Sequence, residues 1–243
     1  MKTFTVYTAT HIGQRKENQD RVIAGRLSGE AVAVVLCDGM GGAAAGGYAA
    51  SLTAEFVSKR LSGGFRAEMS RNALRNLLLT SVTAANALVW EQAQSDNNLF
   101  GMGTTCVAAV LFRERAYIMN VGDSRFYHIS GNNITQITRD HTRVRQLIDD
   151  GILREEDEKL YPARNVITKA IGGESIITPD YFELDLGFDS AAVVCSDGLY
   201  NMLPDDRIAE FALKSPASGS AERLVSYAAE QGGRDNITVA VIV

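Results

Sequence analysis

The stretch VVLCDGMGG, residues 34–42, joins an apolar run to an aspartate and then to a cluster of glycines. The longer run AVAVVLC, residues 31–37, has the length and the β-branched content of a buried strand. Asp38 follows this strand directly, so the strand holds the carboxylate in a fixed position. Gly39 comes next, and its missing side chain leaves the backbone carbonyl sterically free.

The patterns around this stretch predict helices and strands in alternation. Apolar residues at helical spacing predict helices over residues 45–61 and 70–94, and the short β segments of residues 104–138 predict an antiparallel meander. Further strands are expected at residues 181–188, 191–198 and 236–243, and further helices at residues 204–213 and 220–230. This order indicates an α+β fold in which antiparallel sheet and helices form layers.

Residues 141–166 are charged and irregular, with a short helical pattern that stops at Gly151. We expect an exposed flap here, from about residue 142 to residue 170. The 243 residues contain no repeat, low-complexity tract or Pro/Ser-rich linker, and 46% of them are hydrophobic. A single domain over residues 1–243 is therefore expected.

The composition argues against several partners. Lys and Arg number 24 against 29 Asp and Glu, so the net charge of −5 favours neither nucleic acid nor an anionic membrane. No apolar run approaches the roughly 20 residues that span a bilayer, and the first ten residues lack the apolar core of a secretion signal. We expect a cytoplasmic protein in which Cys37, Cys106 and Cys195 serve packing.

Five aspartates stand at strand ends or in turns, most of them beside glycine: Asp20, Asp38, Asp123, Asp197 and Asp235. For any one of them alone, a turn or helix cap is the better explanation. Together they indicate a cluster, and converging carboxylates repel one another unless cations offset their charge. Mg²⁺ and Mn²⁺ favour oxygen ligands, so a few aspartates and a backbone carbonyl suffice to hold two such ions.

Eight motifs in this chain resemble, in the same order, those of the metal-dependent type 2C protein phosphatases of bacteria. They are GQRKENQD, CDGMGG, GTT, NVGDSR, RDHT, RNVITKAIGG, SDGLYNML and RDNITVAVIV. The resemblance covers essentially the whole chain. It implies a four-layer α-β-β-α sandwich of two antiparallel sheets flanked by helices, with a two-metal centre in the cleft at one end.

The resemblance also implies a set of metal ligands. By motif, Asp38 bridges two Mn²⁺ or Mg²⁺ ions, and the carbonyl of Gly39 binds one of them. Asp197 and Asp235 complete the coordination of the other ion. Asp20 holds metal-bound waters.

Two further roles follow from the resemblance. Arg15 clamps the substrate phosphate, and Asp123 joins Asp197 in binding a weaker third ion that bacterial members carry. Eukaryotic relatives often carry a histidine, a proposed general acid, where this chain has Met40. His141 in RDHT is the nearest histidine by motif, and we interpret it as stabilising a loop rather than as a catalyst.

The implied function is metal-dependent hydrolysis of phosphoserine and phosphothreonine in proteins by an activated water. Phosphorylated proteins are the expected substrates, a cognate Ser/Thr kinase is a candidate partner, and a monomer is expected. The signalling role is the reversal of kinase action, with phosphorylated regulators of partner-switching pathways as another target class. The main alternative is a catalytically silent phosphatase-like regulatory or binding module, although all five aspartates are retained.

Two other classes fit poorly. A thiol phosphatase needs an arginine six residues after its cysteine, and here those positions are Ala43, Phe112 and Asn201. Nucleotide binding by the glycines of residues 39–47 is also disfavoured, because no Lys-Ser or Lys-Thr follows them.

Overall fold

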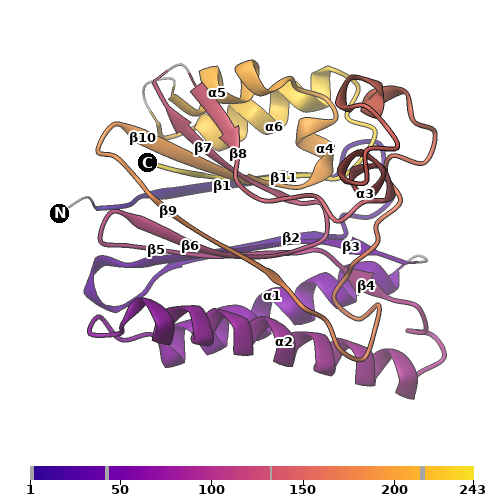
Figure 1. The fold of residues 1–243 in the computed structure, drawn as a ribbon, viewed down its shortest axis with the longest axis horizontal. Helices are drawn as coiled ribbons and strands as arrows, with labels where there is room; N and C mark the ends of the chain where they lie inside the picture. Colours follow the sequence, from indigo (N-terminus) through magenta and orange to yellow (C-terminus); the bar gives the residue numbers. More distant parts are fainter. Residues whose placement is uncertain (1–2, 42–43, 132, 214–216) are drawn as a thin grey trace.

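Two antiparallel sheets pack face to face, and helices cover the outer face of each (Figure 1). The computed structural model describes residues 3–41, 44–131, 133–213 and 217–243. Of the expected features, Gly42 of the glycine cluster and Ala43 lie outside these residues. The predicted four-layer α-β-β-α sandwich is confirmed.

Each sheet mixes strands from distant parts of the chain. Sheet A contains, in spatial order, β1 (Val6–His11), β11 (Ile237–Ile242), β10 (Ser190–Cys195), β7 (Arg125–Ser130) and β8 (Asn133–Gln136). Sheet B contains, in spatial order, β2 (Asp20–Arg26), β3 (Val32–Met40), β5 (Cys106–Phe112), β6 (Arg115–Val121) and β9 (Asp180–Asp185). The short β4 (Gly103–Thr104) also pairs with β3. The first and last strands are therefore neighbours in sheet A.

The helices follow the predicted segments closely. Sheet B is covered by α1 (Ala44–Gly64) and α2 (Arg71–Ser95), and sheet A by α5 (Asp205–Leu213) and α6 (Ser220–Glu230). Ser70 caps α2, because its hydroxyl accepts the backbone N–H of Ala73. The single-turn α4 (Asp197–Tyr200) follows β10 directly, and a short 3₁₀ turn (Ser28–Glu30) links β2 to β3.

The expected single meander is wrong, because the chain changes sheets within it. β5 and β6 form a hairpin in sheet B, whereas β7 and β8 pair in sheet A. The crossing occurs at residues 122–124, which include Asp123. Sequence periodicity could not reveal this, since β5 and β6 are apolar on both faces and fit either sheet equally well.

The central strands are apolar on both faces because each face has its own core. In β3, Val34 and Leu36 pack between the two sheets, while Val35 and Cys37 pack against α1 and α2. This double burial explains the continuous apolar run that precedes Asp38 and the rigidity of its position. All three cysteines are buried and free of disulfides.

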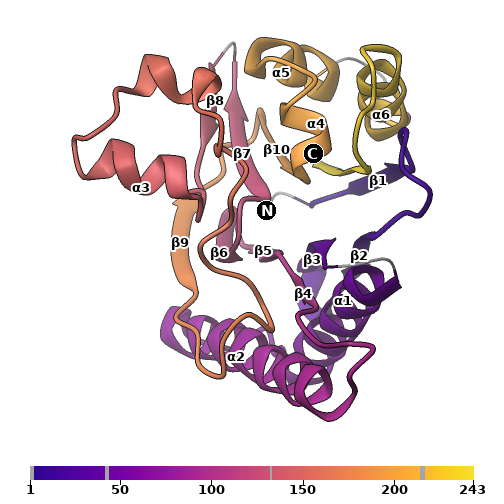
Figure 2. The ribbon, with the colours of Figure 1, turned by 90° about the vertical axis from the view of Figure 1, so that its right-hand side faces the viewer.

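The segment expected to form a flap carries α3 (Arg143–Asp149) and a 3₁₀ turn (Glu155–Leu160), and it projects to one side of the sandwich (Figure 2). Thr142 caps α3 by accepting the N–H of Arg145. Arg145 also reaches Glu155 at 3.1 Å and Glu158 at 3.0 Å, which ties the two pieces together. Nowhere in the described ranges is a helix both long and apolar enough to cross a membrane.

Candidate functional site

Asp20 and Asp38 face each other on neighbouring strands of sheet B. They are direct partners in the β2–β3 register. The backbone of Asp38 is fixed by the GTT motif, since its N–H donates to Thr105 Oγ1 and its carbonyl accepts from Thr104 Oγ1, both at 2.9 Å. Asp20 is buried, and Ser196 Oγ donates to its Oδ2 at 2.7 Å.

Gly39 is required by a close approach of backbone. A Cβ at this position would lie 2.2 Å from the carbonyl oxygen of Gly46 in α1 and 2.8 Å from that of Gln19. The sequence-based explanation, a carbonyl kept free for an ion, therefore omitted the steric reason for this glycine. The residue lines the cleft described below.

Asp197 opens α4 at the end of β10, and Asn201 Nδ2 donates to its Oδ2 at 3.1 Å. Gly198 lies within this helix. A Cβ on Gly198 would lie 2.0 Å from the carbonyl oxygen of Asn236. Its lack of a side chain brings Asp197 up against the strand that follows Asp235.

Asp235 precedes β11 and forms an ion pair with Arg15, with 2.6 Å between Oδ2 and Nη2. Asn236, next in the chain, holds the loop that carries Arg15. Its Nδ2 donates to the carbonyls of Ile12 and Glu17, and its Oδ1 accepts the N–H of Gln19, each at 2.9 Å. Arg15 and Asp235 are thus positioned by one amide.

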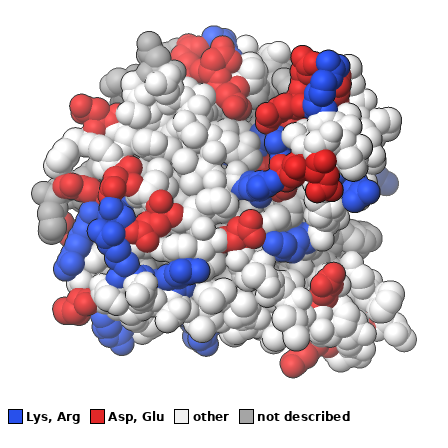
Figure 3. All heavy atoms as spheres, in the orientation of Figure 1, with Lys and Arg blue, Asp and Glu red and all other residues white. Residues whose placement is uncertain are grey.

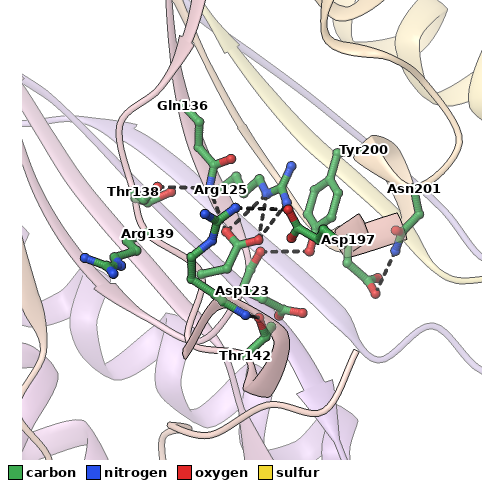
Figure 4. A network of polar contacts seen from close by, with 12 residues as sticks. Asp123, Arg125, Gln136, Thr138, Arg139, Thr142, Asp197, Tyr200 and Asn201 are labelled. Carbon is green, nitrogen blue, oxygen red and sulfur yellow. Dashed lines mark hydrogen bonds and ion pairs between the residues drawn. The ribbon is translucent and has the colours of Figure 1, made fainter. Parts of the chain in front are cut away.

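Asp123 lies in the turn where the chain crosses between the sheets. Its side chain is buried, and its carbonyl accepts the hydroxyl of Tyr200 at 3.0 Å (Figure 4). The guanidinium of Arg125 stacks on Tyr200, with its Cζ 3.6 Å from the centroid of the Tyr200 ring. Arg125 Nη2 also pairs with Asp140 Oδ2 at 2.6 Å. This network lines a second cavity of about 640 Å³, which adjoins the flap.

The structure gathers the predicted residues around one cleft at the end of the sandwich. The cleft has a volume of about 710 Å³. Its walls include Arg15, Asp38, Gly39, Asp123, Asp197 and Asp235, with Met40 and Asn236 beside them. Asp20 alone is not among the lining residues, and it lies behind Asp38 in the β2–β3 pair.

Four aspartates in or beside the cleft have raised pKa values. Burial raises the pKa of Asp38 well above its ordinary value, and the charges of Asp20, Asp197 and Asp123 add to the effect. Burial likewise raises the pKa of Asp197 strongly, that of Asp20 to about 6 and that of Asp123 to about 7. Such mutual repulsion is the electrostatic signature of a site built to receive cations.

Two observations test whether divalent ions fit. Asp20 Oδ1 is buried, and within the described part of the chain it has no hydrogen-bond partner, so it is an oxygen available to a metal-bound water. Conversely, no three His, Cys, Asp or Glu side chains among the described residues lie close enough together to coordinate one ion without further ligands. Mg²⁺ and Mn²⁺ accept backbone carbonyls and waters as ligands, so the donor set fits them.

Sequence reasoning assigned no role to three residues that build the site: Asn236, Thr105 and Ser196. Each lies inside a recognised motif, yet each acts by holding backbone or a carboxylate from a distant segment. Ser196 Oγ, for example, donates to Asp20 and accepts the N–H of Thr238 at 3.0 Å. The contacts of the three residues join segments about 40 to 224 residues apart, so no local pattern could have revealed them.

Comparison with known proteins identifies relatives of this chain. The sequence profile described as Protein phosphatase 2C matches residues 8–237. The serine/threonine phosphatase stp of Listeria welshimeri is 35% identical over 214 residues, which cover 86% of this chain and 83% of that protein. The structure of the S. agalactiae serine/threonine phosphatase superposes with a TM-score of 0.91 at 31% identity and covers 98% of both chains.

A second solved structure bears on the metal question. The catalytic domain of the serine/threonine protein phosphatase PstP, in complex with two manganese ions, has a TM-score of 0.84 to this chain at 30% identity. The match covers 98% of this chain and 97% of that one.

Proposed function

The chain belongs to the bacterial branch of the protein phosphatase 2C family of serine/threonine phosphatases, and from this premise we propose that its acidic cleft hydrolyses phosphoserine and phosphothreonine in proteins. The observation that carries the proposal is the convergence of Asp38, Asp123, Asp197 and Asp235 on one cleft, where the pKa values of Asp38 and Asp197 are raised strongly. An arginine stands at the rim of the same cleft.

Two divalent ions, Mn²⁺ or Mg²⁺, are proposed to bind in this cleft. Asp38 and the Gly39 carbonyl would hold one ion, Asp38 with Asp197 and Asp235 the other, and Asp20 would hold waters of the metal shell. When bound, the ions supply the chemistry: they lower the pKa of a water molecule and offset charge on the phosphoryl oxygens. Asp123 and Asp197 would hold a weaker third ion.

Arg15 would bind the phosphate of the substrate. Its guanidinium is exposed at the cleft, and Asp235 raises its pKa, so it is fully charged. A guanidinium matches two phosphoryl oxygens at once. Arg15 pairs with Asp235 in the structure. This ion pair would break on binding, because Asp235 would bind the metal and Arg15 would bind the phosphate.

The leaving alcohol needs a proton, and the two residues considered from the sequence do not supply it. Met40 lines the cleft but carries no proton to donate. His141 is buried, and its Nδ1 accepts the N–H of Gly122. Neither residue is therefore assigned as the general acid.

The biological substrates would be phosphorylated proteins, and the enzyme would reverse the action of a Ser/Thr kinase. The surface supports protein docking over polyanion binding, since Lys and Arg are interspersed with Asp and Glu on the face in Figure 3. The flap, beside both cavities, would contact the protein around the phosphorylated residue.

Hydrolysis of an aryl phosphate and of a phosphothreonine peptide tests the proposal, measured with Mn²⁺, with Mg²⁺ and with excess chelator. We expect turnover with either ion and none with chelator. Thiol-alkylating reagents should have no effect, because burial raises the pKa of Cys37 and Cys195 and no cysteine lines the cleft. A folded protein without turnover at any metal concentration would instead indicate the silent binding module.

A further inference from the structure

His141 lies behind the turn that carries Asp123. Its Nδ1 accepts the N–H of Gly122 at 3.0 Å, and its own backbone N–H donates to the carbonyl of Gly122, also at 3.0 Å. On another side of this turn, a Cβ on Gly122 would lie 2.6 Å from the Thr105 side chain. The turn next to Asp123 is thus held between His141 and Thr105.

The far side of the His141 ring is held by a second pair of side chains. Nε2 lies 3.3 Å from Oδ2 of Asp180 and 3.2 Å from Nζ of Lys169. Lys169 Nζ also donates to Oδ1 of Asp180 at 3.0 Å and to the carbonyl of Thr178 at 2.9 Å. The ring therefore connects the Lys169–Asp180 ion pair to the backbone of Gly122.

The hydrogen bonds determine the tautomer of the ring. Burial and the charge of Lys169 lower the pKa of His141, which favours the neutral form. Nδ1 accepts the Gly122 N–H, so the single ring proton must be on Nε2, where Asp180 accepts it. Asp180 thereby keeps Nδ1 free to accept.

We propose that His141 is a positioning residue for Asp123 and that Asp180 selects the tautomer in which it can act. This inference rests on the proposed function, in which Asp123 helps to bind the weak third ion. Displacement of the Gly122 turn would move the Asp123 carboxylate while leaving Asp38, Asp235 and the tight pair of ions in place.

Lys169 can also interact with Nε2 of His141, so it provides a test of the tautomer. If residue 180 could not accept a proton, the Lys169 ammonium would donate to Nε2 instead. The neutral ring would then carry its proton on Nδ1, directly opposite the Gly122 N–H. Two donors would face each other and the turn would be released, although the histidine itself would remain.

The first test is a matched pair, His141→Asn and His141→Leu, which have nearly the same size. Asn can present an oxygen near the Nδ1 position, whereas Leu presents no acceptor, and both lose the contacts with Asp180 and Lys169. Aryl phosphate turnover is measured against Mn²⁺ concentration, Mn²⁺ binding by calorimetry, and stability by thermal unfolding. We expect similar melting temperatures, near-normal turnover for Asn, and a fall of about 10- to 100-fold in kcat for Leu at unchanged KM.

Calorimetry separates this inference from the proposed function. We expect two tight Mn²⁺ sites in both variants. The affinity of the third site should be lowered in His141→Leu and unchanged in His141→Asn. If wild-type protein shows no turnover, the proposed function fails, and the Mn²⁺ titrations still decide the positioning role. Equal Mn²⁺ binding by the two variants, or turnover that simply follows melting temperature, would overturn it.

The second test is independent of any loss of the histidine. Asp180→Leu should reduce turnover at low Mn²⁺ concentration by about tenfold or more, because it frees Lys169 to donate to Nε2. Asp180→Asn keeps an acceptor and should have a smaller effect. Adding Lys169→Met to Asp180→Leu should restore activity, and a double variant as impaired as the single one would contradict the tautomer argument.

Discussion

Arg15 Nη2 lies 2.6 Å from Asp235 Oδ2, so the proposed phosphate clamp and a proposed metal ligand occupy each other in this structure. Their side chains are 58% and 37% exposed, so the pair is well solvated and contributes little to stability. It can open at low cost when an ion takes Asp235 and a phosphate takes Arg15. The pair therefore holds both groups in place for ligands that replace it.

Arg15→Ala should weaken substrate capture far more than the chemical step. A hydrogen bond to a charged group contributes roughly 1.5–3 kcal/mol, so KM should rise about 10- to 100-fold with a smaller change in kcat. Steady-state kinetics on a phosphopeptide measure this. The control is Lys16→Ala, a neighbouring exposed cation of the same cleft. Equal effects of the two changes would contradict a specific phosphate contact by Arg15 and would indicate that it only adds positive charge to the cleft.

Metal should stabilise the protein more at pH 7.5 than at pH 5.5. Burial and repulsion raise the pKa of Asp20 to about 6 and that of Asp123 to about 7, so between about pH 4 and 7 the metal-free folded state binds more protons than the unfolded state. Its free energy of unfolding consequently falls as pH rises through this range. Melting temperatures with and without Mn²⁺ at both pH values give the comparison. A larger Mn²⁺ effect at the acidic value would contradict it.

Gly198→Ala should destabilise the fold. The added Cβ would lie 2.0 Å from a backbone oxygen that cannot move without shifting β11. A cost of about 3 kcal/mol is expected, which lowers the melting temperature by about 6–12 °C for a chain of this size. Gly25→Ala is the matched control, because nothing lies within 4 Å of a Cβ there. Calorimetric unfolding of the two variants decides the point.

Asp123→Asn should leave folding and two bound ions intact while lowering turnover about tenfold or more. The amide is nearly isosteric with the carboxylate but lacks the charge that a hard cation prefers. Added Mn²⁺ should recover part of the loss. Asp189→Asn, on the loop between β9 and β10, controls for a general change in charge. If the variant binds two ions and keeps full turnover, Asp123 does not act through a third ion and only stabilises its turn.

Ile152 and Leu160 should contribute to docking of phosphoproteins. They are apolar side chains of the flap with exposed fractions of 71% and 81%. Burying such a side chain in a complex contributes about 1.5 kcal/mol, so replacing both by Ser should lower kcat/KM on a phosphoprotein by about tenfold or more. Hydrolysis of an aryl phosphate should not change. Phe188→Ser, at a similarly exposed site outside the flap, should affect neither substrate.

The sequence carried most of the fold because its long helices show apolar residues at helical spacing and its central strands are continuous apolar runs. The helix expected at residues 70–94 is α2 (Arg71–Ser95), and the apolar run of residues 31–37 lies within β3 and the residue before it. The strands β1 and β2 were not predicted, since they are partly exposed and rich in Thr and Arg. The allocation of strands to sheets was also missed, because a strand that is apolar on both faces does not specify its neighbours.

The site was predicted as a set of residues but not as a set of contacts. The five aspartates stood out in the sequence because each follows or precedes an apolar strand or turn. The Arg15–Asp235 pair, the Asn236 amide and the His141–Gly122 hydrogen bond join segments 19 to 224 residues apart. The pairing of β1 with β11 and the crossing of the chain between the sheets bring these segments together, and neither can be deduced from local sequence.

The position of β11 between β1 and β10 sets an order of events during synthesis. On a ribosome, β1 emerges first and has no partner in sheet A until residues 237–242 follow. Asp235 and the Asn236 amide that holds the Arg15 loop arrive in that same last portion. A nascent chain stalled before this point would carry Asp38 and Asp197 but not the finished cleft. The strand that completes sheet A therefore also completes the site.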